Sequence, residues 1–372
     1  MAHAYTPGLR VSDAATVRRE RRLPLKGEVA AARGDAVRAD QVVARCELPG
    51  EVQTVNLAAR LSIDPARVPG SLLKPVGSDV TRDEPIAEGK SLFGLVKQRV
   101  TSPASGRLES VSSVTGQLIL REPPIPVEIN AYVDGTVHDV LPEEGVVVET
   151  RAAFLQGIFG VGGETGGDVT IAVQSPDQDL TAERLRPEHR GKVLVGGAHV
   201  SHAVLMLARE VGVAAVVVGG FDDRDLRELL GRDLGVAITG AEEIGLTLIL
   251  TEGFGRIRMA DRAWDLLRRF AGRRASVSGA TQIRAGVMRP ELLIPHGEPG
   301  RDAGAADQGL EPGSLLRVIR EPHFGRIGRV TELPSELREL ESGAMVRVLV
   351  VEFADDGSRA VIPRANVERI EP

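Results

Sequence analysis

The chain has 372 residues, of which 42% are hydrophobic and 26% are charged, so it is too apolar for a disordered protein and long enough for two or three domains. Aromatic residues make up only 3% of a chain whose net charge is −6, which disfavours a base-stacking surface. The single cysteine, Cys46, excludes a disulfide framework and a cysteine-based metal cluster. The seven histidines lack metal-motif spacing, and we therefore expect no cofactor and no metal.

Residues 1–22 are expected to form a flexible N-terminus. They contain no apolar signal segment, and the chain nowhere offers the roughly 18 uninterrupted apolar residues of a membrane span. We therefore expect a cytoplasmic protein. A short basic run favours a solvated terminus, with contact to nucleic acid or an anionic membrane as the alternative; it comprises Arg18, Arg19, Arg21 and Arg22.

Residues 23–150 are expected to form a β domain, because short Val-rich runs are cut there by Gly, Pro and Asp. A pattern recurs at 26–50, 74–90 and 102–120, where turns precede hydrophobic strands. Internal similarity of this kind predicts paired β-units that share one core.

These repeats, and SPASGRLESV at 102–111 in particular, resemble the barrel-sandwich hybrids of the biotinyl/lipoyl-carrier superfamily. In carrier members of that superfamily, a lysine at the hairpin tip between the two halves takes the prosthetic group. The corresponding hairpin here is expected at CELPG (46–50), which has no lysine. The resemblance therefore implies a β-scaffold without an attached group.

A connector is expected at 151–187, where glycines crowd the segment GIFGVGGETGGDV at 157–169. Bare backbone N–H groups in such a segment can cradle a phosphate. The phosphate-loop pattern is missing, however, and no clear helix follows the segment. We therefore expect a hinge or a tight connector.

Residues 188–296 alternate between strand and helix patterns, which predicts a compact α/β layer domain with a mostly parallel sheet. The expected strands are 192–197, 214–220 and 246–253, and the expected helices are 201–212, 222–231 and 259–272. Trp264 lies off the main apolar stripe of the last helix, so we expect it to be exposed or at an interdomain seam.

Ligands of open parallel sheets bind at the carboxyl ends of the strands. Glycines and hydroxyl or carboxylate residues gather at the expected ends, which would suit a phosphate or nucleotide; they are Gly196, Gly197, Gly219, Gly220, Thr239, Gly240, Thr251, Glu252 and Gly253. The layout weakly resembles DRTGG-type regulatory domains. Glycines are also needed merely to turn the chain, and that alternative stays open. Neither the pair of His199 and His202 nor the pair of Glu242 and Glu243 has an evident catalytic partner.

A polar linker is expected at 297–312, followed by alternating strands and a DDG hairpin turn at 355–357. Residues 313–372, with 317–318 and 328–330 as the matching positions, resemble the KOW motif of NusG-type transcription factors and several ribosomal proteins. The resemblance implies an SH3-like barrel that docks onto RNA or protein. The residues that we expect at its docking surface are Arg320, His323, Phe324, Arg326 and Arg329.

The charge of this C-terminal segment favours a protein partner. Residues 311–372 contain nine arginines and eleven acidic residues, a net charge of −2. A non-specific phosphate surface needs a basic balance, because its affinity comes largely from counterion release.

The sequence thus predicts a multidomain protein with a barrel-sandwich-like β domain, an α/β domain and a small SH3-like barrel. No catalytic centre is evident in it. We expect a non-enzymatic adaptor or regulator that docks through its KOW barrel, with a small-ligand-sensing α/β domain. The transcription or translation machinery is implied by the KOW resemblance alone. The alternatives are an RNA-binding protein, and an enzyme subunit that binds a phosphate or nucleotide at the strand ends.

Overall fold

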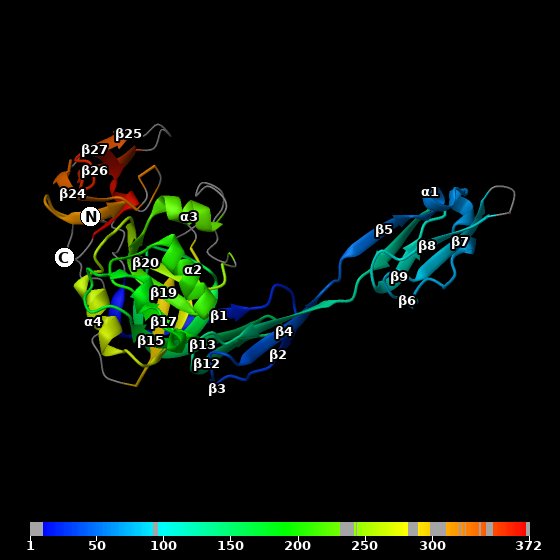
Figure 1. The fold of residues 1–372 in the computed structure, drawn as a ribbon, viewed down its shortest axis with the longest axis horizontal. Helices are drawn as coiled ribbons and strands as arrows, with labels where there is room; N and C mark the ends of the chain where they lie inside the picture. Colours follow the sequence, from blue (N-terminus) through cyan, green and yellow to red (C-terminus); the bar gives the residue numbers. More distant parts are fainter. Residues whose placement is uncertain are drawn as a thin grey trace.

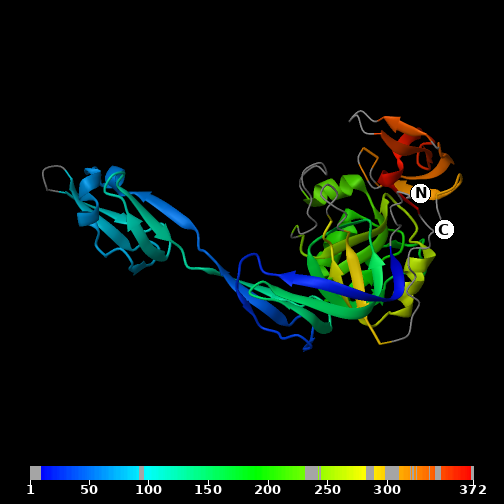
Figure 2. The same ribbon diagram turned by 180° about the vertical axis from the view of Figure 1, so that it is seen from behind.

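The computed structural model describes residues 10–91, 96–230, 242, 244–281, 289–297, 310–318, 320, 322–323, 325–334, 336–339 and 345–369. The protein is β-rich and elongated, with several sheets and few helices (Figure 1). A large body carries a narrow arm that ends in a distal lobe, and a C-terminal unit lies against the body on the side away from the lobe (Figures 1 and 2). None of the helices in the described ranges is long and apolar enough to cross a membrane.

The body is built on a large mixed sheet. Its strand order is β14-β20-β19-β17-β15-β21-β22-β13-β12-β3, and the four neighbours β20, β19, β17 and β15 are parallel. The expectation of a mostly parallel sheet therefore holds only for its middle. The bounds are β3 (Ala36–Val37), β12 (Gly135–Leu141), β13 (Gly145–Gln156), β14 (Phe159–Val161), β15 (Glu164–Ile171), β17 (Val193–Val195), β19 (Ala215–Phe221), β20 (Thr247–Phe254), β21 (Arg274–Ser278) and β22 (Glu291–Pro295). In addition, β18 (His199–Val200) pairs with β19, and β16 (Asp179–Leu180) pairs with β18.

Helices cover both faces of this sheet, as the alternating pattern predicts. On one face α4 (Asp261–Arg269) packs over Val193, Val217 and Ile249. On the other face α2 (His202–Val211) and α3 (Asp223–Leu230) share a core with Leu194, Val216 and Leu248. Because alternate strand residues point to opposite faces, one Val- and Leu-rich strand serves both cores.

The side chain of Trp264 is only 3% exposed and belongs to the core under α4, so the expectation that it is exposed or at an interdomain seam is wrong. The helix is short, and its apolar stripe is wide enough to include Trp264 beside Ala263 and Leu267. On α2, Leu205 is fully buried, whereas Leu207 is exposed.

The glycine-rich segment is part of the sheet and not a connector between domains. Residues 157–169 enter β14, which pairs with β20, and then β15, which pairs with β21 and β17. The glycines allow the strands to pass close to other backbone: a Cβ at Gly162 would overlap the carbonyl oxygen of Leu246.

The expected flexible N-terminus is also wrong from Val11 onward. The strand β1 (Val11–Arg22) pairs along almost the whole of β13. Its arginines reach acidic residues that are distant in the sequence: Arg18 binds Glu149, and Arg21 binds Glu164.

The arm and the lobe are formed by an insertion between two paired strands. The strand β4 (Val42–Leu48) pairs with β11 (Ile125–Asn130), with β2 (Glu28–Val29) at the other side of β4. The intervening residues form the distal lobe (51–122), which has a core of its own. Its elements are β5 (Val52–Asn56), α1 (Leu57–Leu61), β6 (Asp79–Val80), β7 (Pro85–Ser91), β8 (Val96–Thr101), β9 (Gly106–Val111) and β10 (Gln117–Arg121), with one-turn helices at Pro65–Arg67 and Pro69–Ser71.

The hairpin expected at 46–50 is therefore wrong. Cys46 lies inside β4, and Pro49 and Gly50 carry the chain from the arm into the lobe. In the lobe, the segment between the repeats at 74–90 and 102–120 contains the paired strands β7 and β8, in which Lys90 pairs with Lys97 in register.

The C-terminal unit (residues 310–369) is a sheet of order β25-β26-β24-β23-β28, with β27 also on β26, and it has its own core. Its strands are β23 (Leu315–Val318), β24 (Ile327–Glu332), β25 (Leu337–Glu339), β26 (Met345–Phe353), β27 (Arg359–Pro363) and β28 (Val367–Arg369). The turn at 355–357 links β26 and β27, where Gly357 has a φ of 68°. The expected linker falls mostly outside the described residues.

Candidate functional site

Seven of the nine residues predicted at the strand ends are described by the structure, and these seven lie at one edge of the body sheet. The backbone N–H of Gly196 donates to Val217, that of Gly219 donates to Gly197, and Gly220 lies beside Gly253 in the register of β19 and β20. Thr239 and Gly240 lie outside the described residues.

The protein's own backbone fills the space beside these glycines. A Cβ at Gly219 would overlap the carbonyl oxygen of Ile257, and one at Gly220 would overlap that of Gly255. The hydroxyl of Thr251 donates to the carbonyl of Val218 at 3.3 Å. These positions therefore require glycine because backbone segments pass close to each other, whether or not a ligand binds. Ligand binding at this edge stays a prediction.

A buried ion pair joins the C-terminal unit to the same edge. The side chain of Arg317, 1% exposed, donates from Nη2 to Glu252 Oε2 at 3.0 Å and from Nη1 to the carbonyl of Thr251 at 3.3 Å. The other carboxylate oxygen of Glu252 accepts the N–H of Ala260 at 3.0 Å, at the start of α4. One carboxylate therefore holds β23 of the C-terminal unit and α4 of the body together.

The turn after β23 adds a second contact at this seam. Gly325 has a φ of 82°, and a Cβ there would lie 2.7 Å from the ring of Phe254 at the end of β20. The carbonyl oxygen of Gly325 would lie 3.0 Å from a Cβ at Gly253. The C-terminal unit thus lies directly over the edge at which the sequence predicts a ligand.

Sequence reasoning missed the role of Arg317. The sequence did contain a sign of this role, because Arg317 is the one charged residue in an otherwise apolar strand, 315–318. An acidic residue, Glu252, likewise follows the mostly apolar run 246–250. Nothing in the sequence shows that two such residues, 65 positions apart, are partners.

The residues predicted for docking have different surroundings. The guanidinium of Arg326 lies 3.7 Å from the ring centroid of Phe353 and binds both Asp355 and Asp356. The ring of His323 is 5.1 Å from the same phenyl ring. The hydrogen bond that Arg326 donates to Asp355, supported by its bond to Asp356, raises the pKa of Arg326 against the lowering effect of burial. The positive charge of this arginine is therefore largely compensated by two acidic residues of its own unit.

Arg329 is exposed and donates to the carbonyl of Gly313 at 3.3 Å, whereas Arg320 is half-buried. Phe324 lies outside the described residues. The docking role of this set stays a prediction.

The two histidines near the start of α2 each have an acidic neighbour. His199 Nε2 lies 3.2 Å from Asp222 Oδ2, and His202 Nδ1 lies 3.5 Å from Glu228 Oε1. Across the described ranges, no group of three or more His, Cys, Asp or Glu residues is arranged to hold a metal ion. Glu243 lies outside those ranges, so the pair with Glu242 cannot be placed.

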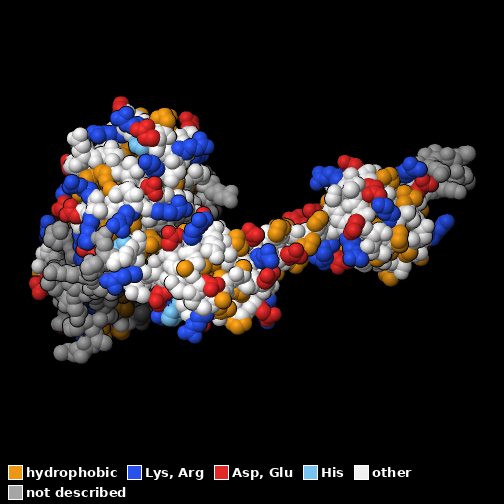
Figure 3. Space-filling view, turned by 90° about the horizontal axis from the view of Figure 1, so that it is seen from below, with side chains coloured by type: hydrophobic (Ala, Val, Ile, Leu, Met, Phe, Trp, Pro, Cys, Tyr) orange, Lys and Arg blue, Asp and Glu red, His pale blue; other side chains and the backbone are white. Residues whose placement is uncertain are grey.

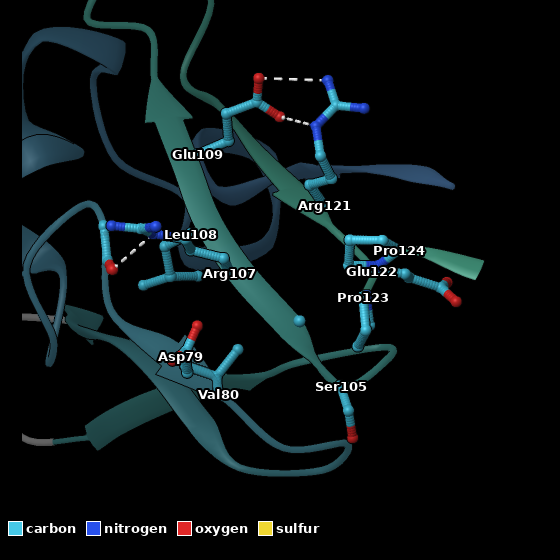
Figure 4. Close-up of a pocket in the computed structure, with 12 residues that line it drawn as sticks. Asp79, Val80, Ser105, Arg107, Leu108, Glu109, Arg121, Glu122, Pro123 and Pro124 are labelled. Carbon is cyan, nitrogen blue, oxygen red and sulfur yellow. Dashed lines mark hydrogen bonds and ion pairs between the residues drawn. The ribbon is translucent and has the colours of Figure 1, made fainter. Parts of the chain in front are cut away.

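The distal lobe has an open groove of about 820 Å³ that the sequence did not reveal. Its floor is β9, and its walls are β6 and the chain that leaves the lobe at 121–124 (Figure 4). Arg121 and Glu109 form a two-bond ion pair at one end, with distances of 2.7 and 3.1 Å. Arg107 donates from Nε to the carbonyl of Gly77 at 2.8 Å.

No known family model matches this chain, and no curated protein matches it either.

Proposed function

We propose that the protein is a non-enzymatic adaptor in which the body and the C-terminal unit form a base and the distal lobe is a docking end. The observation that carries the proposal is the lobe itself: a unit with its own core, held away from the base by the paired strands β4 and β11 (Figure 3). Such an arm allows one protein to bridge two partners.

Exposed apolar side chains support this assignment. Ten large hydrophobic residues are exposed in the described part of the chain; four lie in the lobe, and a fifth, Ile125, follows it directly. The four are Val52, Leu73, Val76 and Val114. These exposed apolar side chains give the lobe surface that a protein partner could cover.

The resemblances add to the proposal. The repeats at 74–90 and 102–120 both fall within the lobe, which suits a barrel-sandwich-like scaffold. The KOW resemblance of the C-terminal unit supports a place in a larger cytoplasmic assembly. Leu337, Met345 and Val361 are exposed on that unit and would serve as a second docking surface. The net charge of −2 over residues 311–372 and the ion pairs that compensate Arg326 favour protein over RNA.

The lobe can be removed cleanly to test the proposal. Its two ends lie side by side, because the N–H of Glu122 donates to the carbonyl of Glu51 at 2.9 Å. A variant with residues 51–122 replaced by a short Gly-Ser turn should keep the base folded, as judged by circular dichroism. Cross-linking and affinity capture should show that this variant loses a specific partner that the full chain retains.

A variant that lacks residues 311–372 is the control for the base. We expect it to lose a different partner, or none. Identical partner sets for the full chain and the lobe-deleted variant would contradict the docking role of the lobe.

A further inference from the structure

The outer edge of β5 in the distal lobe is an unprotected strand edge. The lobe sheet has the order β5-β10-β9-β6, so β5 has a partner on one side only. The carbonyl of Glu51 accepts the N–H of Glu122, and the N–H of Leu57 donates to the carbonyl of Gly116, so both residues hydrogen-bond towards β10. Because the residues of an antiparallel strand alternate in the side to which their main-chain groups point, the N–H and C=O groups of Val52 and Thr54 point away from β10. In the described part of the chain, no residue binds these outward groups.

Sheet edges elsewhere in the described structure are blunted in the ways that proteins use against unwanted pairing. The opposite edge of the same sheet, β6, has two residues and includes Asp79. The long strand β1 carries four arginines, and β11 carries Pro126 and Glu128. In contrast, β5 has five residues with no charge and no proline, and the exposed side chains on its outer face are Val52, Thr54 and Asn56.

We infer that β5 pairs with β5 of a second copy of this chain, antiparallel and with Thr54 facing Thr54 of its partner. Each Thr54 would then exchange N–H···O bonds with its counterpart, and Val52 would face Asn56 of the other copy. Threonine pairs are favourable across antiparallel strands, and neutral side chains avoid repulsion at the symmetry axis. The two lobe sheets would become one continuous sheet.

The charges at the two ends of β5 favour a second copy over an unrelated peptide. Glu51 precedes the strand and Arg60 lies in α1 directly after it. Both are exposed, and neither has an ion-pair partner among the residues that the structure covers. Antiparallel pairing brings the acidic start of one strand towards the basic end of the other, twice, by symmetry.

The arm makes this arrangement sterically possible. In Figures 1 and 2, β5 begins at the arm and runs along the margin of the lobe towards α1. Antiparallel pairing therefore directs the two arms away from each other, and the two bodies lie at opposite ends. Such a dimer would give the proposed adaptor two bases joined through their lobes. The dimer does not depend on any further partner, so its failure would leave the bridging role untouched.

Light scattering coupled to size exclusion, repeated over a range of concentrations, tests the inference on the full chain. We expect a concentration-dependent dimer, because a single strand pair is a small interface. Thr54→Pro removes an outward N–H without breaking a bond to β10, and it should raise the dissociation constant at least about tenfold. Thr54→Val keeps the main-chain groups and should remain dimeric. Circular dichroism and thermal unfolding confirm that each variant is folded.

A charge exchange supplies a second, independent measurement. Glu51→Arg should weaken the dimer, and so should Arg60→Glu, whereas the double exchange should restore it. The inference is overturned if the wild-type chain is monomeric up to its solubility limit, or if it is a dimer that Thr54→Pro leaves unchanged. It is also overturned if the double exchange fails to restore a dimer that both single exchanges weaken.

Discussion

Replacing Arg317 should uncouple the C-terminal unit from the body. In Arg317→Met, the carboxylate of Glu252 stays buried and, among the residues that the structure describes, keeps the N–H of Ala260 as its hydrogen-bond partner. Removing one partner of a buried ion pair costs about 3–5 kcal/mol, because the remaining charge is left without compensation. The exposed ion pairs elsewhere on this chain contribute at most about 1 kcal/mol each, so the expected loss exceeds that of any exposed pair.

Urea unfolding of the full chain measures the loss, with limited proteolysis around residues 298–312 to show release of the C-terminal unit. The matched control is Arg317→Met combined with Glu252→Gln, since glutamine still accepts the N–H of Ala260 but carries no charge. This double variant should recover most of the stability lost in the single variant. A single variant that loses less than about 1 kcal/mol, or a double variant that is no better than the single one, would refute the reasoning.

Three further predictions concern single side chains. Trp264, 3% exposed, should fluoresce at short wavelength and resist acrylamide until the body unfolds; ready quenching in the folded state would contradict its burial. Burial raises the pKa of Tyr132 well above 10, so the stability of the fold should decrease as the pH rises above about 10. In a Tyr5→Phe variant, in which Tyr132 is the remaining tyrosine, tyrosinate absorbance should appear only when the protein unfolds. The hydrogen bond from Ser358 lowers the pKa of Asp356 to about 2, so its stabilising effect should be complete above about pH 3.8 and lost as the pH falls through 2. Carboxyl NMR shifts that titrate near pH 4 would contradict the last prediction.

The α/β elements were predictable because their signals are local. The apolar spacing of residues 259–272 depends on neighbouring turns of one helix, and α4 forms inside that range. The strand β26 belongs to the alternating pattern expected before the turn at 355–357, because Val-rich alternation and a following turn need no distant partner. The strands β17, β19 and β20 likewise begin within one residue of their expected starts.

The arm and the N-terminal strand were not predictable, because their partners are distant in the sequence. The repeats indicated similar β-units but not which of them share a core: 26–50 contributes to the arm, whereas 74–90 and 102–120 form the lobe. The basic run at 18–22 looks like a solvated terminus until Glu149 and Glu164 are placed beside it. Those acids are more than a hundred residues away.

The strand-end glycines show why a site cannot be assigned from residue type alone. A glycine allows either a ligand or the chain's own backbone to approach, and only the atoms beside the missing Cβ separate the two cases. Beside Gly219 that neighbour is the carbonyl oxygen of Ile257, so Gly219→Ala should destabilise the body whether or not a ligand exists. Gly70, which has open space at its Cβ position, is the matched control and should tolerate alanine. A test of ligand binding at this edge therefore has to release the C-terminal unit, for example through the Arg317 and Glu252 variants, and leave the glycines intact.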